Sequence, residues 1–126
     1  MFRVLVVDDE KNVLTTLSIG LKRHDYQVSQ AKSGPEALKL LEEQPFDFVV
    51  SDIRMLPMDG YTLASLIRNR HPQIGIVLMS AYAFEEKEER LKALGLPWLT
   101  KPFDVTDLVG ILEDEKNKKE LEAGRF

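Results

Sequence analysis

Short apolar runs alternate with amphipathic segments along the whole chain. The runs are rich in β-branched residues and most of them stop at a polar residue, which is typical of strands buried on both faces of a sheet. Only the run at 26–29 alternates between apolar and polar residues, as an edge strand does. We therefore predict five strands, at residues 3–7, 26–29, 46–50, 74–79 and 98–100.

Between the strands, apolar residues recur at intervals of three or four, which predicts amphipathic helices. Ser33 begins one of them with a good cap, because Pro35 suits the first turn and Glu36 stands three residues after the serine. The helix predicted at 84–94 is highly charged and has a thin apolar face, so we expect it to be mobile. The other helices are predicted at about 11–24, around 63–67 and around 105–112.

The order of these elements predicts a parallel sheet with helices on both faces, because a strand and a helix alternate five times. A closed barrel of this kind needs about 250 residues, and the chain has 126. We therefore predict one flavodoxin-like, doubly wound α/β domain over residues 1–113, with strand order 2-1-3-4-5. For the charged residues 114–126 three interpretations stay open: a solvated helical extension, a fraying tail, or the stub of a linker to an output domain.

Composition excludes several classes of function. The formal net charge is −4 and the basic residues are scattered, which argues against direct nucleic-acid binding. The absence of cysteine excludes disulfides and thiolate metal sites. No apolar stretch approaches the roughly 20 residues that span a bilayer. We expect a soluble, cytoplasmic domain that does not contact a membrane.

Polar residues stand where the predicted strands end. They are Asp8, Asp9, Asp52, Ser80 and Lys101. In an open doubly wound sheet, ligands bind beyond the carboxyl ends of the strands at the switch point of the strand order, which here lies between the first and third strands. Each residue alone has a simpler explanation, such as helix capping or a turn. Their joint placement at four strand ends predicts a single site.

The chemistry of this set indicates phosphoryl transfer. Three clustered carboxylates repel one another unless a cation joins them, and oxygen ligands without sulfur or imidazole favour Mg²⁺. A lysine supplies positive charge for phosphate oxygens, and a serine hydroxyl donates to another. The set is typical of a carboxylate nucleophile that forms an acyl phosphate.

The chain resembles the receiver domain of two-component response regulators from about residue 2 to about residue 113. The resemblance rests on five pieces in a fixed order: Val6–Glu10, Asp52–Met55, Met58–Gly60, Met79–Ala81 and Lys101–Phe103. It implies that Asp52 receives a phosphoryl group from the histidine of a sensor kinase or phosphotransfer protein. It also implies that Asp9, Asp52 and the backbone carbonyl of Arg54 bind Mg²⁺ directly, while Asp8 acts through water.

The resemblance further implies a switch. Lys101 contacts the phosphoryl group, Ser80 turns toward it, and Trp98 turns inward from a position where the family usually has tyrosine or phenylalanine. The outer face of the fourth helix, fifth strand and fifth helix then changes for an unknown output domain or partner, or for a phosphorylation-linked homodimer. Such a domain promotes its own phosphorylation and dephosphorylation but is not a separate enzyme. The Lys101–Pro102 peptide is expected to be cis.

Two other interpretations compete with a phosphorylated receiver. An aspartyl-phosphate phosphohydrolase needs a second acid two residues after its nucleophile, where this chain has Arg54, and a cap domain for which the chain has no room. A phosphorylation-independent, receiver-like binding scaffold is the main alternative. The loop after Asp52, which would lie over the metal, keeps the scaffold interpretation open. In this loop Leu56 stands where the family usually has proline, and Pro57 follows.

Overall fold

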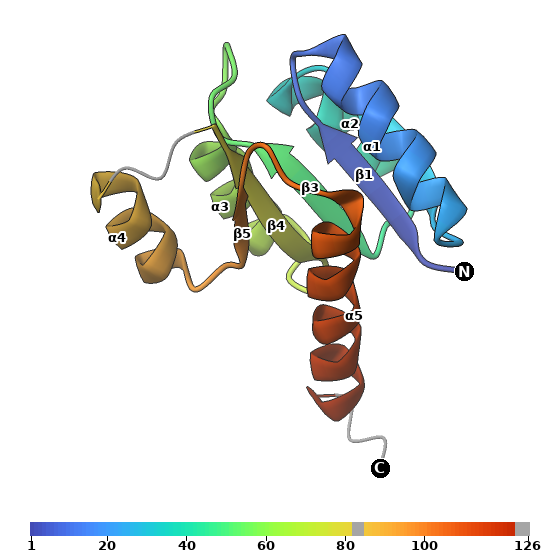
Figure 1. The fold of residues 1–126 in the computed structure, drawn as a ribbon. Helices are drawn as coiled ribbons and strands as arrows, with labels where there is room; N and C mark the ends of the chain where they lie inside the picture. The colour runs from blue at the N-terminus through green and yellow to red at the C-terminus, as the bar shows by residue number, and fades with distance from the viewer. Residues whose placement is uncertain (82–84, 123–126) are drawn as a thin grey trace.

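The computed structural model describes residues 1–81 and 85–122 and contains a five-stranded sheet between two layers of helices (Figure 1). All strands are parallel, in the order β2-β1-β3-β4-β5, so the predicted topology is confirmed. The elements are β1 (Arg3–Val7), α1 (Lys11–Arg23), β2 (Gln27–Ala31), α2 (Gly34–Glu43), β3 (Phe48–Asp52), α3 (Gly60–Arg70), β4 (Gly75–Ser80), α4 (Glu85–Leu94), β5 (Trp98–Thr100) and α5 (Val105–Glu122).

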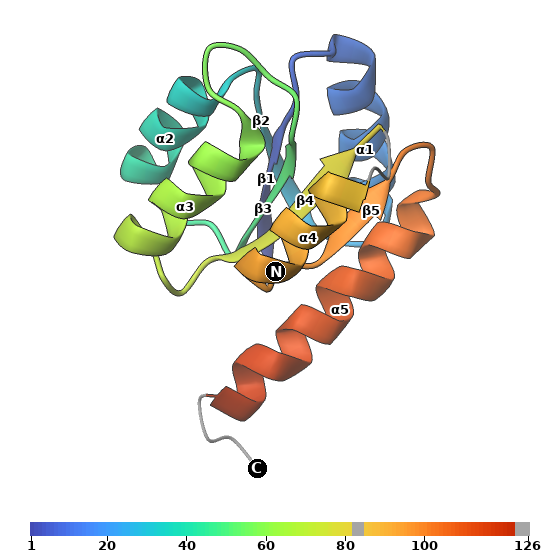
Figure 2. The ribbon, with the colours of Figure 1, turned by 90° about the vertical axis from the view of Figure 1, so that its left-hand side faces the viewer.

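Each face of the sheet has its own apolar core. On one face, side chains of α2, α3 and α4 pack on alternate residues of the strands, including Leu5, Val49 and Leu78. On the other face, α1 and α5 pack on the residues in between, such as Val6 and Phe48. Figure 2 shows these two sets of helices on either side of the strands. The strands β1, β3 and β4 are buried along almost their whole length because both of their faces are covered.

Local signals explain where several elements begin. Ser33 caps α2 as predicted, because its side chain accepts the backbone N–H of Glu36 at 3.3 Å. The third strand begins at Phe48, two residues later than predicted, although Asp47 is already joined to β1: its N–H donates to the Arg3 carbonyl at 2.9 Å, and its carboxylate accepts the Arg3 N–H at 2.8 Å. The predicted first residue of α4, Phe84, lies outside the described residues. The predicted mobility of α4 stays a prediction.

In the described part of the chain, no helix is both long enough and apolar enough to cross a membrane. The most extended helix is α5, which continues past the lower end of the sheet to Glu122 (Figure 1). The proposed division of the chain at residue 113 falls inside this helix.

The second half of α5 is held against the domain by two lysines that lie over aromatic rings. The Lys116 ammonium is 4.4 Å from the ring centres of both Phe2 and Tyr26. The same ammonium lies 2.8 Å from the Glu113 carboxylate, which also accepts the Tyr26 hydroxyl at 2.9 Å. One turn later, the Lys119 ammonium donates to the Asp47 carbonyl at 2.8 Å and lies 4.7 Å from the Phe48 ring centre. These contacts hold the extension on the amino ends of the strands.

We expect Lys116→Met to lower the free energy of unfolding by about 1 kcal/mol, because it removes a cation held between two rings and an ion pair. Methionine keeps most of the apolar stem, so the loss reports the charge. Urea unfolding followed by circular dichroism measures it. Lys118→Met is the matched control, since that side chain is 66% exposed and its loss should change little. Equal losses in both variants would contradict a specific role for Lys116.

Candidate functional site

The site lies at the carboxyl edge of the sheet, where the sequence placed it. Asp8 and Asp9 follow β1, Asp52 and Ser80 are the last residues of β3 and β4, and Lys101 follows β5 directly. Parallel strands bring these ends to one edge. Carboxylate oxygens of Asp8, Asp9 and Asp52 all lie within 4.8 Å of one another. The structure thus gathers the three predicted acids into one cluster.

Lys101 is the cation that faces this cluster. Its ammonium lies 2.8 Å from Asp8 Oδ2 and 3.5 Å from Asp52 Oδ1. The lysine is fixed in turn by its own backbone, because its N–H donates to the Ser80 carbonyl at 2.7 Å. Burial works against its charge, but the hydrogen bond to Asp8 and the charges of Asp52 and Asp8 prevail and raise the pKa of Lys101. The ammonium therefore stays protonated across the physiological range.

The three acids differ in exposure. Asp8 is fully buried, and besides Lys101 it accepts the backbone N–H of Glu10 at 2.9 Å. Asp52 is 7% exposed, whereas Asp9 is exposed to solvent. Burial raises the pKa of Asp52 to about 6, with Lys101 opposing the shift and the Asp8 charge adding to it. Asp52 is thus a buried carboxylate that reaches the surface at one edge and is still ionised at neutral pH.

The loop after β3 brings the backbone close to Asp52. The Ile53 N–H donates to the Met79 carbonyl at 2.9 Å, and the Ile53 carbonyl accepts the Gly60 N–H at 2.7 Å. A Cβ atom at Gly60 would lie 2.3 Å from the Asp52 carbonyl oxygen, so this position requires glycine. Asp59 then caps α3 by accepting the Thr62 N–H at 2.8 Å. Gly60 stands within a motif that the sequence shows, but its packing role is visible only in the structure.

The donor set suits a hard divalent cation. The acids offer only oxygen, they approach from two strand ends, and one of them is exposed enough to meet an ion from solvent. Lys101 offsets only part of the negative charge, since three carboxylates face a single ammonium. Such a cluster could hold a divalent cation, and the pKa of Asp52 is raised mainly by burial, with the charge of Asp8 adding to the shift.

Comparison with known proteins agrees with this geometry. Residues 4–113 match the family model described as the response regulator receiver domain. The chain belongs to the response regulator receiver family. The predicted resemblance is therefore confirmed over most of the chain.

Relatives of this receiver occur in longer proteins. It is 40% identical over 111 residues to the transcriptional regulatory protein ZraR of Escherichia coli K12, covering 87% of this chain and 25% of the relative. It is 35% identical over 109 residues to the heme response regulator HssR of Staphylococcus aureus, covering 86% of this chain and 49% of the relative. The chain thus spans from a quarter to a half of the length of these two relatives.

Solved structures show the same receiver fold. The chemotaxis protein CheY4 of Vibrio cholerae superposes with a TM-score of 0.83 at 31% identity, covering 90% of this chain and 98% of that one. The response regulator TrrA of Thermotoga maritima, solved in complex with Mg²⁺ and BeF, superposes with a TM-score of 0.82 at 30% identity and the same coverage. The flavodoxin-like fold is therefore established.

One local feature that the resemblance implied is confirmed by the backbone of this receiver. The Lys101–Pro102 peptide is cis as expected, and the Leu56–Pro57 peptide is cis as well. Leu56 is 85% exposed in the loop beside the acids. Trp98 is partly buried against the core that α2, α3 and α4 cover. Because Trp98 pairs with Leu78, and Thr100 with Ser80, the side chains at 80 and 98 point to the same face of the sheet.

The Asp52 pKa predicts a stability difference that depends on pH. Its folded value of about 6 lies above the ordinary value of 3.8, so the folded state holds the proton more tightly than the unfolded chain. The contribution of Asp52 to stability is therefore favourable at low pH and is lost as pH rises from about 4 to about 6. We expect Asp52→Asn to be more stable than the wild type by about 2 kcal/mol at pH 7 without metal.

Chemical denaturation in metal-free buffer at pH 4, 5, 6 and 7 measures this gap, which should widen as pH rises. Asp114→Asn on the exposed surface of α5 is the matched control and should show no such trend. A gap that stays constant with pH, or that favours the wild type at pH 7, would contradict the buried, raised-pKa carboxylate.

Proposed function

We propose that Asp52 of this receiver is the phosphoacceptor, and that it takes its phosphoryl group from the histidine of a sensor kinase or phosphotransfer protein. The observation that carries the proposal is the buried Asp52 carboxylate, which lies 3.5 Å from the Lys101 ammonium and within 4.8 Å of two further acids. A carboxylate with a cation at this distance can attack phosphorus, while the cation stabilises the negative charge of the transferred group.

The transfer balances without any further reactant. An oxygen of Asp52 forms a bond to phosphorus, the bond between phosphorus and the donor's imidazole nitrogen breaks, and its electron pair returns to that nitrogen. The product carries three peripheral oxygens, which need donors and positive charge. Lys101 stands beside Asp52 and is held there by Asp8 and the Ser80 carbonyl. Its role is to neutralise one of these oxygens.

The acids provide the metal site of this proposal. Asp9, Asp52 and the backbone carbonyl of Arg54 would bind Mg²⁺ directly, and Asp8 would act through water. A bound Mg²⁺ supplies positive charge that offsets both the carboxylates and the phosphoryl oxygens. Within the protein itself, burial of Asp8 and its bond to Lys101 fix the position of that lysine relative to Asp52.

Ser80 and Trp98 form the proposed switch. Ser80 is 3% exposed at the end of β4, next to the site, and shares a sheet face with Trp98. A hydroxyl that turns toward the phosphoryl oxygens vacates space on this face, into which Trp98 rotates. The change appears on the surface of α4, β5 and α5, where an output domain, a partner or a second phosphorylated copy binds. In this proposal the domain only takes up and releases a phosphoryl group. It acts as a switch in the cytoplasm and not as a separate enzyme.

A direct experiment is incubation with acetyl phosphate and MgCl₂, read by intact mass and by the fluorescence of Trp98, the single tryptophan. We expect the wild type to gain one phosphoryl group and to change its fluorescence. Asp52→Asn should do neither. Ser80→Ala should gain the phosphoryl group but lose most of the fluorescence change, because the hydroxyl that couples the two is gone.

Two controls separate the parts of this proposal. Omission of MgCl₂ should abolish the mass increase in every variant. Ser65→Ala, an exposed position on α3, should behave as the wild type does. No mass increase in the wild type would overturn the phosphoacceptor and favour a phosphorylation-independent binding scaffold. A full fluorescence change in Ser80→Ala would overturn only the switch.

A further inference from the structure

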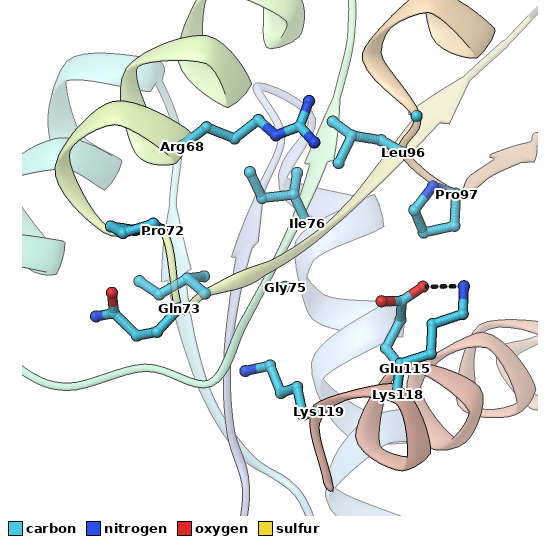
Figure 3. Close-up of a pocket in the computed structure, with 12 residues that line it drawn as sticks. Arg68, Pro72, Gln73, Gly75, Ile76, Leu96, Pro97, Glu115, Lys118 and Lys119 are labelled. Atoms are coloured by element: carbon cyan, nitrogen blue, oxygen red, sulfur yellow. Dashed lines mark hydrogen bonds and ion pairs between the residues drawn. The ribbon is translucent and has the colours of Figure 1, made fainter. Parts of the chain in front are cut away.

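A cavity opens at the opposite end of β4 from the acid cluster. Its volume is about 360 Å³, and it lies among α3, the start of β4, the turn before β5 and the α5 extension. Figure 3 shows Arg68 on one side of it and Glu115, Lys118 and Lys119 on the other. Ser80 is five residues from Gly75, which corresponds to about 17 Å along a strand. The cavity is therefore separate from the acid cluster.

The cavity exists because β5 is too short to cover all of β4. In the β4–β5 ladder, Leu78 donates its N–H to the Pro97 carbonyl and Lys101 donates to the Ser80 carbonyl. The next bond of this parallel ladder would run from the N–H of residue 97 to the Ile76 carbonyl. Proline has no N–H, so the ladder stops there. The first half of β4 is left facing the cavity, and Ile76 lines it.

The charge of the lining is positive in a chain whose net charge is −4. Three lining residues are cationic, Arg68, Lys118 and Lys119, and only Glu115 is acidic. Arg68 donates one of its five N–H groups to the Leu94 carbonyl. Lys118 pairs with Glu115 at 3.4 Å and is 66% exposed, while Lys119 is bound to the Asp47 carbonyl. The resulting local charge is about +2, which is opposite in sign and similar in size to the charge of a phosphate dianion.

The remaining walls are apolar. Ile74, Ile76, Leu96 and Pro97 line the cavity between the two cationic sides. A volume of this size is within the range of small-molecule sites. Arginine and lysine together are the side chains that bind phosphate groups, arginine through its planar fork and lysine as a point charge.

We propose that this cavity binds a small phosphate-bearing ligand, whose phosphate group is attracted by the cations that line the cavity, Arg68 on one side and Lys118 on the other, and whose remaining part packs on Ile76 and Pro97. Lys119 adds positive charge from the floor while it keeps its bond to Asp47. The site joins α3 to the α5 extension, and Arg68 also holds the last turn of α4 through Leu94. The ligand thereby lies between α3 and α5 at the end of the strands away from Asp52.

The test is a titration of ¹⁵N-labelled protein with inorganic phosphate, without metal and at constant ionic strength set with NaCl. We expect saturable shifts of the Gly75, Ile76, Gly95 and Leu96 amides. The double variant Arg68→Gln, Lys118→Gln should bind about tenfold more weakly, since a hydrogen bond between charged groups is worth at least that factor. The double variant Lys22→Gln, Arg23→Gln removes the same charge from exposed residues of α1 and should bind as the wild type does.

Glu115→Gln should change phosphate affinity in the opposite direction. Tighter binding cannot result from a variant that merely unfolds. It removes the one acid of the lining, so phosphate should bind about two- to fivefold more tightly, the range for one exposed charge interaction. Shifts confined to residues around Lys101 would show that phosphate binds only at the acid cluster and would overturn the proposal. The same conclusion would follow from equal binding by wild type, the Arg68 and Lys118 variant and Glu115→Gln.

Discussion

The ion pair between Lys101 and the fully buried Asp8 is the contact on which the site depends. A buried carboxylate without a partner is strongly destabilising, and here the partner stands 2.8 Å away. The same ammonium reaches Asp52 at 3.5 Å, while the lysine backbone is tied to the end of β4. One cation thus fixes the ends of β1, β3 and β4 relative to one another. It cannot neutralise three acids, so the site retains negative charge that suits a divalent cation.

The helix α5 runs from the carboxyl ends of the strands to their amino ends. It begins shortly after Lys101 and Pro102, at the carboxyl edge, and its last turns lie on the amino edge, where Lys116 and Lys119 contact Phe2, Tyr26 and Phe48. A displacement of the Lys101 segment therefore acts on a helix whose far end is held by charge and aromatic contacts. Those contacts also shape the basic cavity, since Lys118 and Lys119 leave α5 on that side.

Much of this structure follows from local patterns in the sequence. Strand order, both helical layers and the gathering of the acids result from apolar periodicity and from polar residues at strand ends. The lysines over aromatic rings could not be predicted, because Phe2 and Tyr26 are far from Lys116 along the chain. The bonds between Asp47 and Arg3 could not be predicted either, because these two residues are also far apart along the chain. The need for glycine at position 60 appears only when the Asp52 carbonyl is seen against it.

The most direct measurement is the thermal unfolding midpoint of the wild type and of the double variant Asp9→Asn, Asp52→Asn in a series of MgCl₂ concentrations at pH 7, with NaCl keeping ionic strength constant. A cation that binds only the folded state adds about 1.4 kcal/mol at ten times its dissociation constant. The wild-type midpoint should therefore rise with MgCl₂, while that of the variant stays unchanged. A wild-type midpoint that ignores MgCl₂, or an equal rise in both proteins, would contradict a metal site built from these carboxylates.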